Sequence, residues 1–599
     1  MWCANLWRLE RLLLILAAPV FLSTTVRGAT SPCLDPSDED YRCVSSGAAS
    51  DSGTLRLRSC GLTDDDLDDV AACLDSFGRD NMTELNLSFN DLTYVPGELF
   101  EGLSSLENLY LSYNNLNGTL ESGLFSDLTS LQQLFISSVG LTTLPDNIFA
   151  DLSSLVTLSL SDNEFSTLDP QIFLGLASLE TLTLTGNALT TLPGVIFAGL
   201  SSLRYLSLWG NELLTLESDT FSGLYVLETL FLDSNNLTSL PREVFADLTS
   251  LGFLTLNNNN MSTVEIGAFS GLSSLLILDF TRAGLTSLPD NVFADLSSLE
   301  GLFMSGNKLE TLNLGTFSGL TSLETLGLSD NALTSIPIGV FSGLSSLTLL
   351  GMSLNELVTL ESGTFSGLHS LESLTLRGAF ASDAAVSLPE DIFQGLHSLR
   401  SLSLYDNAIS ALESDIFSGL TSLEVLILDS NNLMTLPYDI FTELSVLRIL
   451  TLSDNGLSLL EYGTFSGLTS LETLDLNGNE LSTLSAGLFA GFTSNTTIDL
   501  QENGDLQCLP ITNAVVLLDS EDIRNGTCGC APDVAVSCDE GLTCQPGLAG
   551  YTCELSVGGT PSPTSARTLA PAAAISLAPS SAPTSFFTFS PTSAPSEGG

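Results

Sequence analysis

The apolar residues of the chain recur with a fixed period of about 24 residues over most of its length. One period is residues 323–346, LETLGLSDNALTSIPIGVFSGLSS, whose apolar positions and single turn asparagine are Leu326, Leu328, Asn331, Leu333, Ile336, Phe341 and Leu344. The next period repeats these residue classes at Leu350, Met352, Asn355, Leu357, Leu360, Phe365 and Leu368. A sustained repeat of this length predicts a solenoid in which each period forms one coil.

Within a coil, the spacing of the leucines predicts a short strand followed by a return path. Leu326 and Leu328 alternate with other residues, so the leucines face one side of the strand and the residues between them face the other. Asn331 follows the strand, and its amide can both donate and accept hydrogen bonds, so we expect it to satisfy backbone groups of its own and adjacent coils. Seventeen phenylalanines, from Phe100 to Phe489, recur at one position of the return path and are expected to stack as a buried spine.

The pattern LxxLxLxxNxLxxLPxxxFxGLxx resembles the typical 24-residue class of extracellular leucine-rich repeats, similar to those of Toll-like receptor ectodomains and small leucine-rich proteoglycans. The resemblance extends from about Leu55 to Leu509. It implies an α/β repeat solenoid, a leucine-rich-repeat horseshoe with a parallel β-sheet on the concave face. The return segments are then irregular or short-helical, and disulfide-bonded caps close the two ends.

The composition divides the chain into six parts. Residues 1–28 are predicted to be a signal peptide, because two arginines precede the apolar run Leu12–Leu22 and small residues precede Ala29. Residues 29–81 are an N-terminal cap with a first, ribonuclease-inhibitor-like repeat, and 82–505 hold eighteen leucine-rich repeats. Residues 506–529 form a C-terminal cap and 530–556 a small Cys-rich module. The Pro/Ser/Thr-rich tail, 557–599, is expected to be disordered, and we expect no transmembrane segment in the mature chain.

Departures from the regular repeat are few. Thr63 and the acidic residues after it predict a helix in the first coil, since a threonine cap and early carboxylates favour a helix start. The turn asparagine is replaced in three coils, by Val139, Ala283 and Ala379, and the segment 379–388 is four residues longer than its counterparts. A second period of about 48 residues alternates proline with acidic residues on the return path, with Asn313 in one acidic position. Expansion of a two-coil unit predicts this alternation. The alternative is that the proline and acidic rows are distinct contact strips on the outer surface.

The cysteines lie only at the ends of the repeats. Removal of the signal peptide would leave ten, and these candidate disulfide residues are Cys33, Cys43, Cys60, Cys73, Cys508, Cys528, Cys530, Cys538, Cys544 and Cys553. Cysteines at both ends of a secreted solenoid favour stapled caps, although the spacing leaves the connectivity open. Zinc binding is the alternative, but the paired CxxC motifs of a zinc site are missing. The module 530–556 resembles an epidermal-growth-factor-like unit but lacks its internal CxC.

The sequence also contains seven sequons for N-linked glycosylation. They lie at Asn81, Asn86, Asn117, Asn236, Asn260, Asn495 and Asn525. Together with the signal peptide they favour an extracellular protein, secreted or associated with the cell surface or cell wall.

Charge and residue content exclude several classes of function. The net charge is −54, with 70 acidic and 16 basic residues, which disfavours nucleic acid as a partner and favours a cationic one. The two histidines, His369 and His397, occupy equivalent sites of neighbouring coils where other coils carry Ser or Thr. We therefore expect solvent exposure rather than a metal pair, and we expect no cofactor, metal or catalytic residue.

Binding is the favoured function, because side chains between the strand leucines face the concave side and can vary freely. Two aromatic groups fall on this face, and aromatic and arginine side chains are frequent contact anchors. The candidate ligand-binding residues are Tyr110, Tyr113 and Phe135 in the first group, and Arg204, Tyr205, Trp209, Phe231 and Phe253 in the second.

The sequence therefore predicts a non-catalytic recognition protein that binds a protein or glycan ligand on its concave face. The alternative is a structural or adhesive protein of an extracellular matrix or cell wall, in which the acidic solenoid acts as a spacer.

Overall fold

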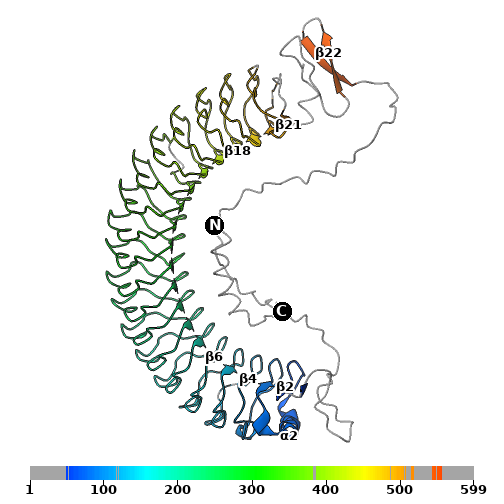
Figure 1. The fold of residues 1–599 in the computed structure, drawn as a ribbon, viewed down its shortest axis with the longest axis vertical. Helices are drawn as coiled ribbons and strands as arrows, with labels where there is room; N and C mark the ends of the chain where they lie inside the picture. The colour runs from blue at the N-terminus through cyan, green and yellow to red at the C-terminus, as the bar shows by residue number, and fades with distance from the viewer. Residues whose placement is uncertain are drawn as a thin grey trace, which may run out of the picture.

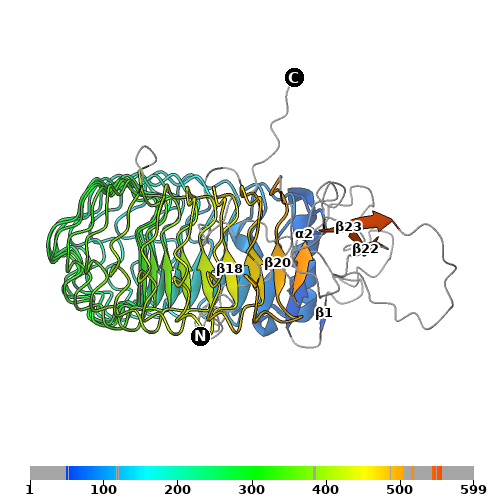
Figure 2. The ribbon, with the colours of Figure 1, turned by 90° about the horizontal axis from the view of Figure 1, so that it is seen from above.

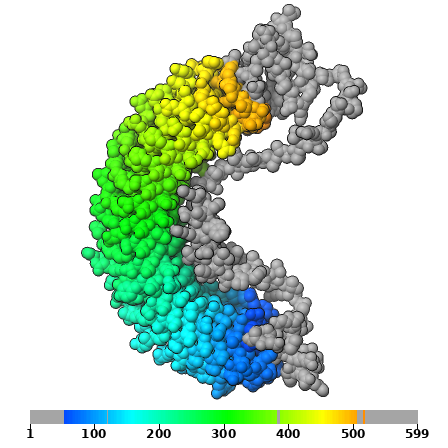
Figure 3. Space-filling model, in the orientation of Figure 1, coloured from blue at the N-terminus to red at the C-terminus, as the bar shows by residue number. Residues whose placement is uncertain are grey.

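The computed structural model of the chain is a curved solenoid whose strands line the inner side of the arc (Figure 1). It describes residues 49–50, 53–116, 118, 120–381, 386–485, 487–504, 506, 514–517, 542–547 and 550–555. Seen from above, the strands lie side by side in a single sheet (Figure 2), and the coils pack into one continuous body (Figure 3).

Each coil contributes one strand of three residues to the sheet. The strands are β2 (Thr54–Arg56), β3 (Glu84–Asn86), β4 (Asn108–Tyr110), β5 (Gln133–Phe135), β6 (Thr157–Ser159), β7 (Thr181–Thr183), β8 (Tyr205–Ser207), β9 (Thr229–Phe231), β10 (Phe253–Thr255), β11 (Ile277–Asp279), β12 (Gly301–Phe303), β13 (Thr325–Gly327), β14 (Leu349–Gly351), β15 (Ser373–Thr375), β16 (Ser401–Ser403), β17 (Val425–Ile427), β18 (Ile449–Thr451), β19 (Thr473–Asp475), β20 (Thr497–Asp499) and β21 (Val515–Leu517). Each pairs in parallel with the next, and β1 (Ala49–Ser50) pairs antiparallel with β2. A separate antiparallel hairpin consists of β22 (Leu542–Gly547) and β23 (Gly550–Leu555).

The leucine pattern places the core as the sequence predicts. The central leucine of each strand from β2 to β19 is fully buried, and Leu326 and Leu350 are register partners in neighbouring coils. Their strand neighbours, such as Thr325, are only half-buried and face the concave side. The parallel concave sheet is thereby confirmed.

The turn asparagines form a ladder of hydrogen bonds between coils. In a typical coil, the Asn331 side-chain nitrogen donates to the Leu328 carbonyl at 3.1 Å and to the Met304 carbonyl of the preceding coil at 3.0 Å. Its side-chain oxygen accepts from the Leu309 backbone nitrogen of that coil at 3.1 Å. The predicted role of Asn331 is confirmed, because one amide satisfies three buried backbone groups that would otherwise lack partners.

Two of the coils that lack the asparagine use the backbone in its place. The Ala283 carbonyl accepts from the Met261 nitrogen at 2.7 Å, and the Ala379 carbonyl accepts from the Leu357 nitrogen at 3.0 Å. Both alanines also donate their own N–H to the carbonyl three residues earlier. The backbone nitrogens of Met261 and Leu357 therefore keep a hydrogen-bond acceptor in the next coil, although alanine replaces the turn asparagine there.

The residue before the turn asparagine adopts a left-handed backbone. Asp330 has φ of 57°, and Gly306 occupies the same position of the preceding coil with φ of 72°. Glycine, aspartate and asparagine tolerate this region most easily, yet Phe89, Tyr113 and Leu354 also occupy it. The sequence pattern alone did not reveal this requirement.

The predicted phenylalanine spine is confirmed. All seventeen rings are buried, and fourteen of the sixteen consecutive pairs stack with centroids 5.8 to 6.4 Å apart, as in the pairs Phe269 with Phe293 and Phe393 with Phe417. The return path of each coil therefore contributes one buried ring to a continuous core.

The first coil contains the predicted helix in a modified form. Asp64–Asp66 form a single 3-10 turn, η1, and the α-helix α2 spans Leu67–Phe77. The Asp66 carboxylate accepts from the Thr63 backbone nitrogen at 2.7 Å, which fixes the start of the turn. Asp64 instead accepts from the backbone nitrogen of Thr93 at 2.8 Å, so it caps the next coil rather than the helix.

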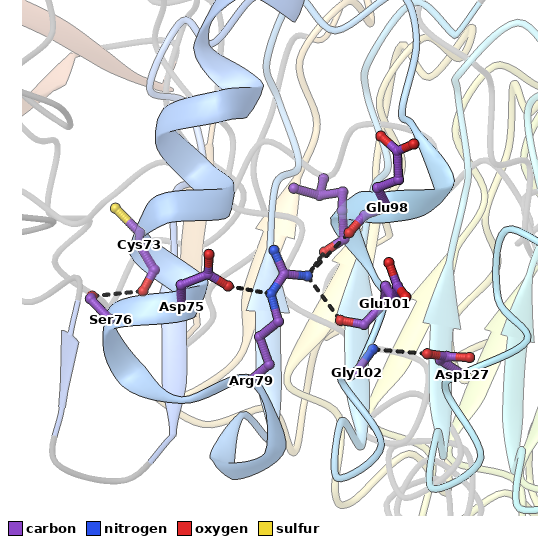
Figure 4. A network of polar contacts seen from close by, with 9 residues as sticks. Cys73, Asp75, Ser76, Arg79, Glu98, Glu101, Gly102 and Asp127 are labelled. Atoms are coloured by element: carbon purple, nitrogen blue, oxygen red, sulfur yellow. Dashed lines mark hydrogen bonds and ion pairs between the residues drawn. The ribbon is translucent and has the colours of Figure 1, made fainter.

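Arg79 joins the first coil to the second (Figure 4). It belongs to η2 (Arg79–Asn81), and its Nε donates to Asp75 at 2.5 Å. Its Nη1 donates to three carbonyls at the end of η3 (Gly97–Leu99), those of Glu98, Leu99 and Glu101, at 2.9 to 3.1 Å. A cation is favourable at the carboxyl end of a helical turn, so this contact stabilises the coil junction.

Several predictions concern residues outside the described set. These are the signal peptide, the tail, the sequons at Asn117 and Asn525, and the cysteines Cys33, Cys43, Cys508, Cys528, Cys530 and Cys538. Cys60 and Cys73 are disulfide-bonded, and Cys544 and Cys553 occupy opposite backbone positions of the β22–β23 hairpin. In the part of the chain that the structure describes, no helix has the length and apolar character needed to cross a membrane.

Candidate binding face

Three rows of side chains form the concave face. The first row holds the residue directly before the central leucine of each strand, and the second row holds the residue directly after this leucine. The third row holds the residue three positions after the same leucine. Successive strands of a sheet are about 4.8 Å apart, so residues in one row on neighbouring coils are in reach of each other. Side chains of one row on neighbouring coils can therefore contact each other.

The structure brings together two of the three residues in the first predicted aromatic group. Tyr110 on β4 and Phe135 on β5 occupy the same row, and their rings are parallel with centroids 5.1 Å apart. The Tyr110 hydroxyl donates to Gln133 at 3.3 Å, and burial raises the pKa of Tyr110.

Tyr113 belongs to a different cluster from the one predicted. Its ring stacks on Phe89 with centroids 4.2 Å apart, and the Arg58 guanidinium lies 4.3 Å from the Phe89 centroid on the other side. Phe89 and Tyr113 both occupy the left-handed turn position, outside the three-residue strands. With 49% of its surface exposed, Tyr113 ends this stack.

The second predicted group holds together over three strands. The rings of Tyr205 on β8 and Phe231 on β9 have centroids 5.6 Å apart, and Phe231 and Phe253 on β10 have centroids 6.2 Å apart. Both pairs are tilted, an arrangement that aromatic rings favour. Trp209, three residues beyond the centre of β8, is half-buried on the same face.

Arg204 is placed at the margin of this group and not over its rings. It lies two residues before the centre of β8, and its guanidinium forms an ion pair with Glu228 of the next coil. Both side chains are more than half exposed, so this pair contributes little stability. Arg448 and Glu472 form a similar pair in the same row, with nitrogen to oxygen distances of 2.9 and 3.0 Å.

The two aromatic groups remain separate, because small hydroxyl residues occupy the coils between them. Ser137 and Ser159 have hydroxyl oxygens 2.7 Å apart, and Ser159 and Thr183 have theirs 2.8 Å apart. The structure thus defines two aromatic surfaces on the concave face, and the larger one spans β8 to β10.

Sequence reasoning missed an apolar continuation of this larger surface. Ile277 on β11 is the register partner of Phe253, and Phe303 lies on β12. A Cβ atom added to Gly301 would meet Ile277 Cδ1 at 2.8 Å and Phe303 Cε2 at 3.1 Å, so both side chains lie over this glycine. Ile277 lies in the row of Phe253, and Phe303 lies in the row of Phe231. These shared positions in the repeat could have identified both residues from the sequence.

Two aspartates lie within this surface. Asp233, three residues beyond the centre of β9, accepts from the Thr255 hydroxyl at 2.5 Å, and Asp279 on β11 accepts from the Thr281 nitrogen at 2.8 Å. Burial raises the pKa of Asp233 to about 6 and also raises the pKa of Asp279. These carboxylates were not among the predicted site residues.

The C-terminal end of the face is acidic and not aromatic. Asp429, beyond β17, accepts from the nitrogen and hydroxyl of Ser453 at 2.7 and 2.9 Å, and burial raises its pKa. Asp475 on β19 and Asp499 on β20 are register partners. Burial is the main cause that raises the pKa of Asp475 to about 6, and neighbouring carboxylates add to it.

The histidines lie away from this face. His369 Nδ1 is 3.4 Å from the Gly395 carbonyl and His397 Nδ1 is 3.1 Å from the Gly419 carbonyl, and both side chains are exposed. Each ring therefore contacts the next coil's backbone. The described residues include no group of three or more His, Cys, Asp or Glu that could hold a metal ion.

Four sequon asparagines in the described part of the chain are exposed. Asn236 and Asn260 occupy equivalent positions of neighbouring coils, beside the strands that carry Phe231 and Phe253, and Asn81 and Asn495 lie near the two ends. Asn86 differs because it is half-buried on the concave side of β3, where its side-chain oxygen accepts from the Ser88 nitrogen at 3.0 Å.

A comparison with family models finds one family along most of the solenoid. The model described as Leucine rich repeat matches residues 80–138, 133–189, 178–237, 225–282, 276–333, 321–378, 382–433 and 445–504. These segments together cover more than half of the 599 residues. No curated protein sequence matches the chain at a significant level.

Solved structures of similar fold include the Toll–Spatzle complex of Drosophila. That match has a TM-score of 0.57 and 22% identity, and it covers 77% of this chain and 57% of the Toll chain. The chain therefore spans little more than half the length of that protein. A leucine-rich repeat protein of Leptospira interrogans matches with a TM-score of 0.48 and 27% identity, over 73% of this chain and 91% of that chain.

Proposed function

The chain belongs to the leucine-rich repeat family, and on that premise we propose that it is a recognition protein that binds a macromolecular ligand on its concave face without catalysis. The observation that carries this proposal is the aromatic surface across β8 to β10. Tyr205, Phe231 and Phe253 converge there on the outside of a sheet whose stability depends on the leucines beneath.

The position of these rings is what favours binding over a structural role. Aromatic side chains on an exposed face gain little for the fold, whereas they supply large rigid contact areas when a partner covers them. The coils of β6 and β7 carry only Ser and Thr at the same row positions, and the apolar side chains continue on the other side only to Ile277 and Phe303, so the rings are a local feature and not part of the repeat. Toll, whose fold is similar, forms a complex with Spatzle in its solved structure, which is consistent with a binding role for a solenoid of this kind.

The proposed location is extracellular. Ten cysteines restricted to the ends, seven sequons and the predicted signal peptide support secretion or display at the cell surface or cell wall. Of the sequons, Asn236 and Asn260 are accessible to glycosylation, and a glycan on each would border the aromatic surface.

The test compares the full-length secreted protein with the double variant Trp209→Ala and Phe231→Ala. Extracellular extract is applied to both, the captured molecule is identified, and its stoichiometry and Kd are measured by calorimetry. We expect the wild type to bind one defined ligand at fixed stoichiometry and the double variant to lose at least about tenfold in affinity, as expected for removal of central aromatic anchors.

A matched control is Ser159→Ala with Thr183→Ala, which alters the same face of the hydroxyl coils and removes no ring. Circular dichroism and thermal unfolding establish that each variant is folded. Equal ligand binding by the wild type and the aromatic double variant would contradict the proposal.

The second candidate function is that of a structural or adhesive spacer in an extracellular matrix or cell wall. The observation in its favour is the acidic surface of a chain with net charge −54, which can bind cationic polymers diffusely. Diffuse binding is abolished by moderate salt, because exposed charges are screened beyond about 8 Å at physiological ionic strength. A ligand retained in 0.5 M salt and lost in the aromatic variant distinguishes recognition from this role.

A further inference from the structure

The strands β9 to β12 place two carboxylates among apolar side chains on the concave face. In the row after the central leucine, the register partners run Phe231, Thr255, Asp279 and Phe303. Asp279 therefore lies one strand from Phe303 and two strands from Phe231, with neighbouring strands about 4.8 Å apart. The row before the leucine adds Phe253 and Ile277, which are also register partners.

Asp233 joins Asp279 at the same place. It lies two residues after Phe231, so both side chains are on the concave face of β9. Thr255, between the two aspartates, donates its hydroxyl to Asp233 at 2.5 Å. An ionised carboxylate can accept about four hydrogen bonds, so Asp233 and Asp279 both keep acceptor capacity for a ligand.

Neither carboxylate has a basic partner within the part of the chain that the structure describes. Ion pairs are found instead at other places, between Arg56 and Glu84 on the face and between Arg400 and Glu424 at its margin. Arg282, three residues after Asp279, extends over Gly306 of the next coil. Partly buried charges are costly unless they are paired, so this pair of aspartates is the feature of the surface that the fold does not explain.

We propose that this surface receives a lysine or arginine side chain of a protein partner, with its charge bound by Asp233 and Asp279 and its aliphatic part packed against Phe231, Phe253 and Ile277. The inference rests on the proposed function and names the chemistry of the contact. Long basic side chains combine an apolar stem with a charged end, which matches apolar walls around carboxylates. Cations are also attracted to aromatic faces.

A metal ion fits the same surface less well. Calcium takes six to eight oxygen ligands, and the described residues here offer two carboxylates with apolar neighbours. The net charge of −54 adds a long-range attraction for basic partners, which speeds their encounter with the face.

The test uses labelled peptides acetyl-Gly-Leu-Xaa-Leu-Gly-amide, in which Xaa is Lys, Arg, Met or Glu. Binding to the full-length protein in physiological salt is measured by fluorescence anisotropy. We expect the Lys and Arg peptides to bind about tenfold tighter than the Met peptide, and the Glu peptide to bind weakest. Asp233→Asn or Asp279→Asn should remove this preference and leave Met-peptide binding unchanged.

The matched control is Asp475→Asn, which removes the same charge from a half-buried carboxylate of the concave face on a distant coil. The preference for Lys and Arg should persist in this variant. If all three variants lose it equally, the attraction is diffuse and the proposal is overturned. It is also overturned if the wild type shows no preference for Lys or Arg over Met.

A measurement on the wild type decides the matter where a variant fails to fold. The pKa of Asp233 is raised to about 6 by burial, so the preference for Lys should decline between pH 7.5 and pH 5. The other ionisable groups that face the site are Tyr205 on β8, Glu228 and Arg282 at the edges, and Asp279, whose pKa is also raised. A preference unchanged at pH 5 would contradict the proposal, and ligand loss in the aromatic double variant would still support the recognition function.

Discussion

The interior of each coil and its concave face use neighbouring residues of the same strand in opposite ways. Leu326 and Leu350 in the interior are interchangeable members of one column, and the rings of Phe341 and Phe365 stack with centroids 6.3 Å apart. On the concave face, a single row changes from Phe231 to Thr255 and then to Asp279. The contrast teaches that packing constrains the inner column, whereas a face position has only to be compatible with a strand.

The largest expected effect comes from removing one ring of the spine. Phe341→Ala should lower the free energy of unfolding by about 3 to 5 kcal/mol, because a fully buried ring leaves a cavity between two neighbouring rings. Phe231→Ala, on the concave face, should cost less than about 1 kcal/mol. Urea unfolding of the full chain measures both. Equal costs would show that the face is part of the core after all.

The asparagine ladder offers a matched pair within one coil. Asn235 donates to the carbonyls of Leu208 and Leu232 at 3.0 and 3.1 Å and accepts from the Leu213 nitrogen at 3.0 Å. Asn235→Ala should destabilise the protein by about 2 to 3 kcal/mol, since three buried backbone groups lose a partner.

The control for this variant is Asn236→Ala, at the next position. Its side chain is exposed, so the change should stay within about 0.5 kcal/mol when the protein carries no glycan. If Asn235→Ala is equally mild, the backbone has taken over as it does at Ala283, and hydrogen exchange of the Leu213 amide would reveal it.

The acidic end of the face should make stability depend on pH. Burial raises the folded-state pKa of Asp475 to about 6, above the ordinary value of 3.8 for this group, so the folded protein binds a proton more readily than the unfolded chain. Stability should therefore rise as the pH falls from about 7 to about 4. Asp475→Asn should flatten this slope and stabilise the protein at pH 7 by about 1 kcal/mol or less, because solvent screens the partly exposed group.

Chemical denaturation across that pH range measures the slope. Glu180→Gln, which alters an exposed carboxylate at the edge of β7, is the control and should leave the slope as in the wild type. A slope that is unchanged in Asp475→Asn would mean that other carboxylates set the pH dependence.

Effects of opposite sign, one of them the smallest expected, distinguish a glycine of the face, Gly351, from a glycine of the left-handed turn, Gly306. Gly351→Ala should stabilise the protein by about 0.5 kcal/mol, because its backbone suits any residue. An added Cβ would meet the hydroxyls of Ser329 at 3.3 Å and Thr375 at 3.6 Å and the Leu326 carbonyl at 4.0 Å, which leaves room for it. Gly306→Ala should destabilise by about 1 kcal/mol, since φ is 72° and Arg282 Cγ lies 2.6 Å from the new atom. Thermal unfolding distinguishes the two, and shifts of the same sign would refute this explanation.

The sequence predicted the fold in most respects because every coil repeats the same packing problem. The periodic leucines and phenylalanines must be buried, and Asn331 must bond to the backbone of its own and the preceding coil. Stacking such coils places their strands side by side in a parallel sheet. The left-handed residue before the asparagine escaped prediction, because several residue types fill that position and none marks it.

The candidate site was predicted only in part, for a related physical reason. Tyr205, Phe231 and Phe253 could be grouped from their coil numbers, and the structure shows their rings in contact. Tyr113 stacks instead on Phe89, because both residues sit on the turn and not in the strand. Pairing between side chains of neighbouring coils depends on rotamers and burial, which a period does not encode.

The bend of the molecule follows from two unequal repeat distances. The phenylalanine rings recur every 5.8 to 6.4 Å, and neighbouring strands recur about every 4.8 Å, so each coil is a wedge that is wider at its ring than at its strand. If the chain gained or lost a two-coil unit, the radius of the arc would stay the same. The arc itself would become longer or shorter. The clearance between the two ends of the arc, and so the largest object that can enter it, is therefore set by how many wedges the gene encodes.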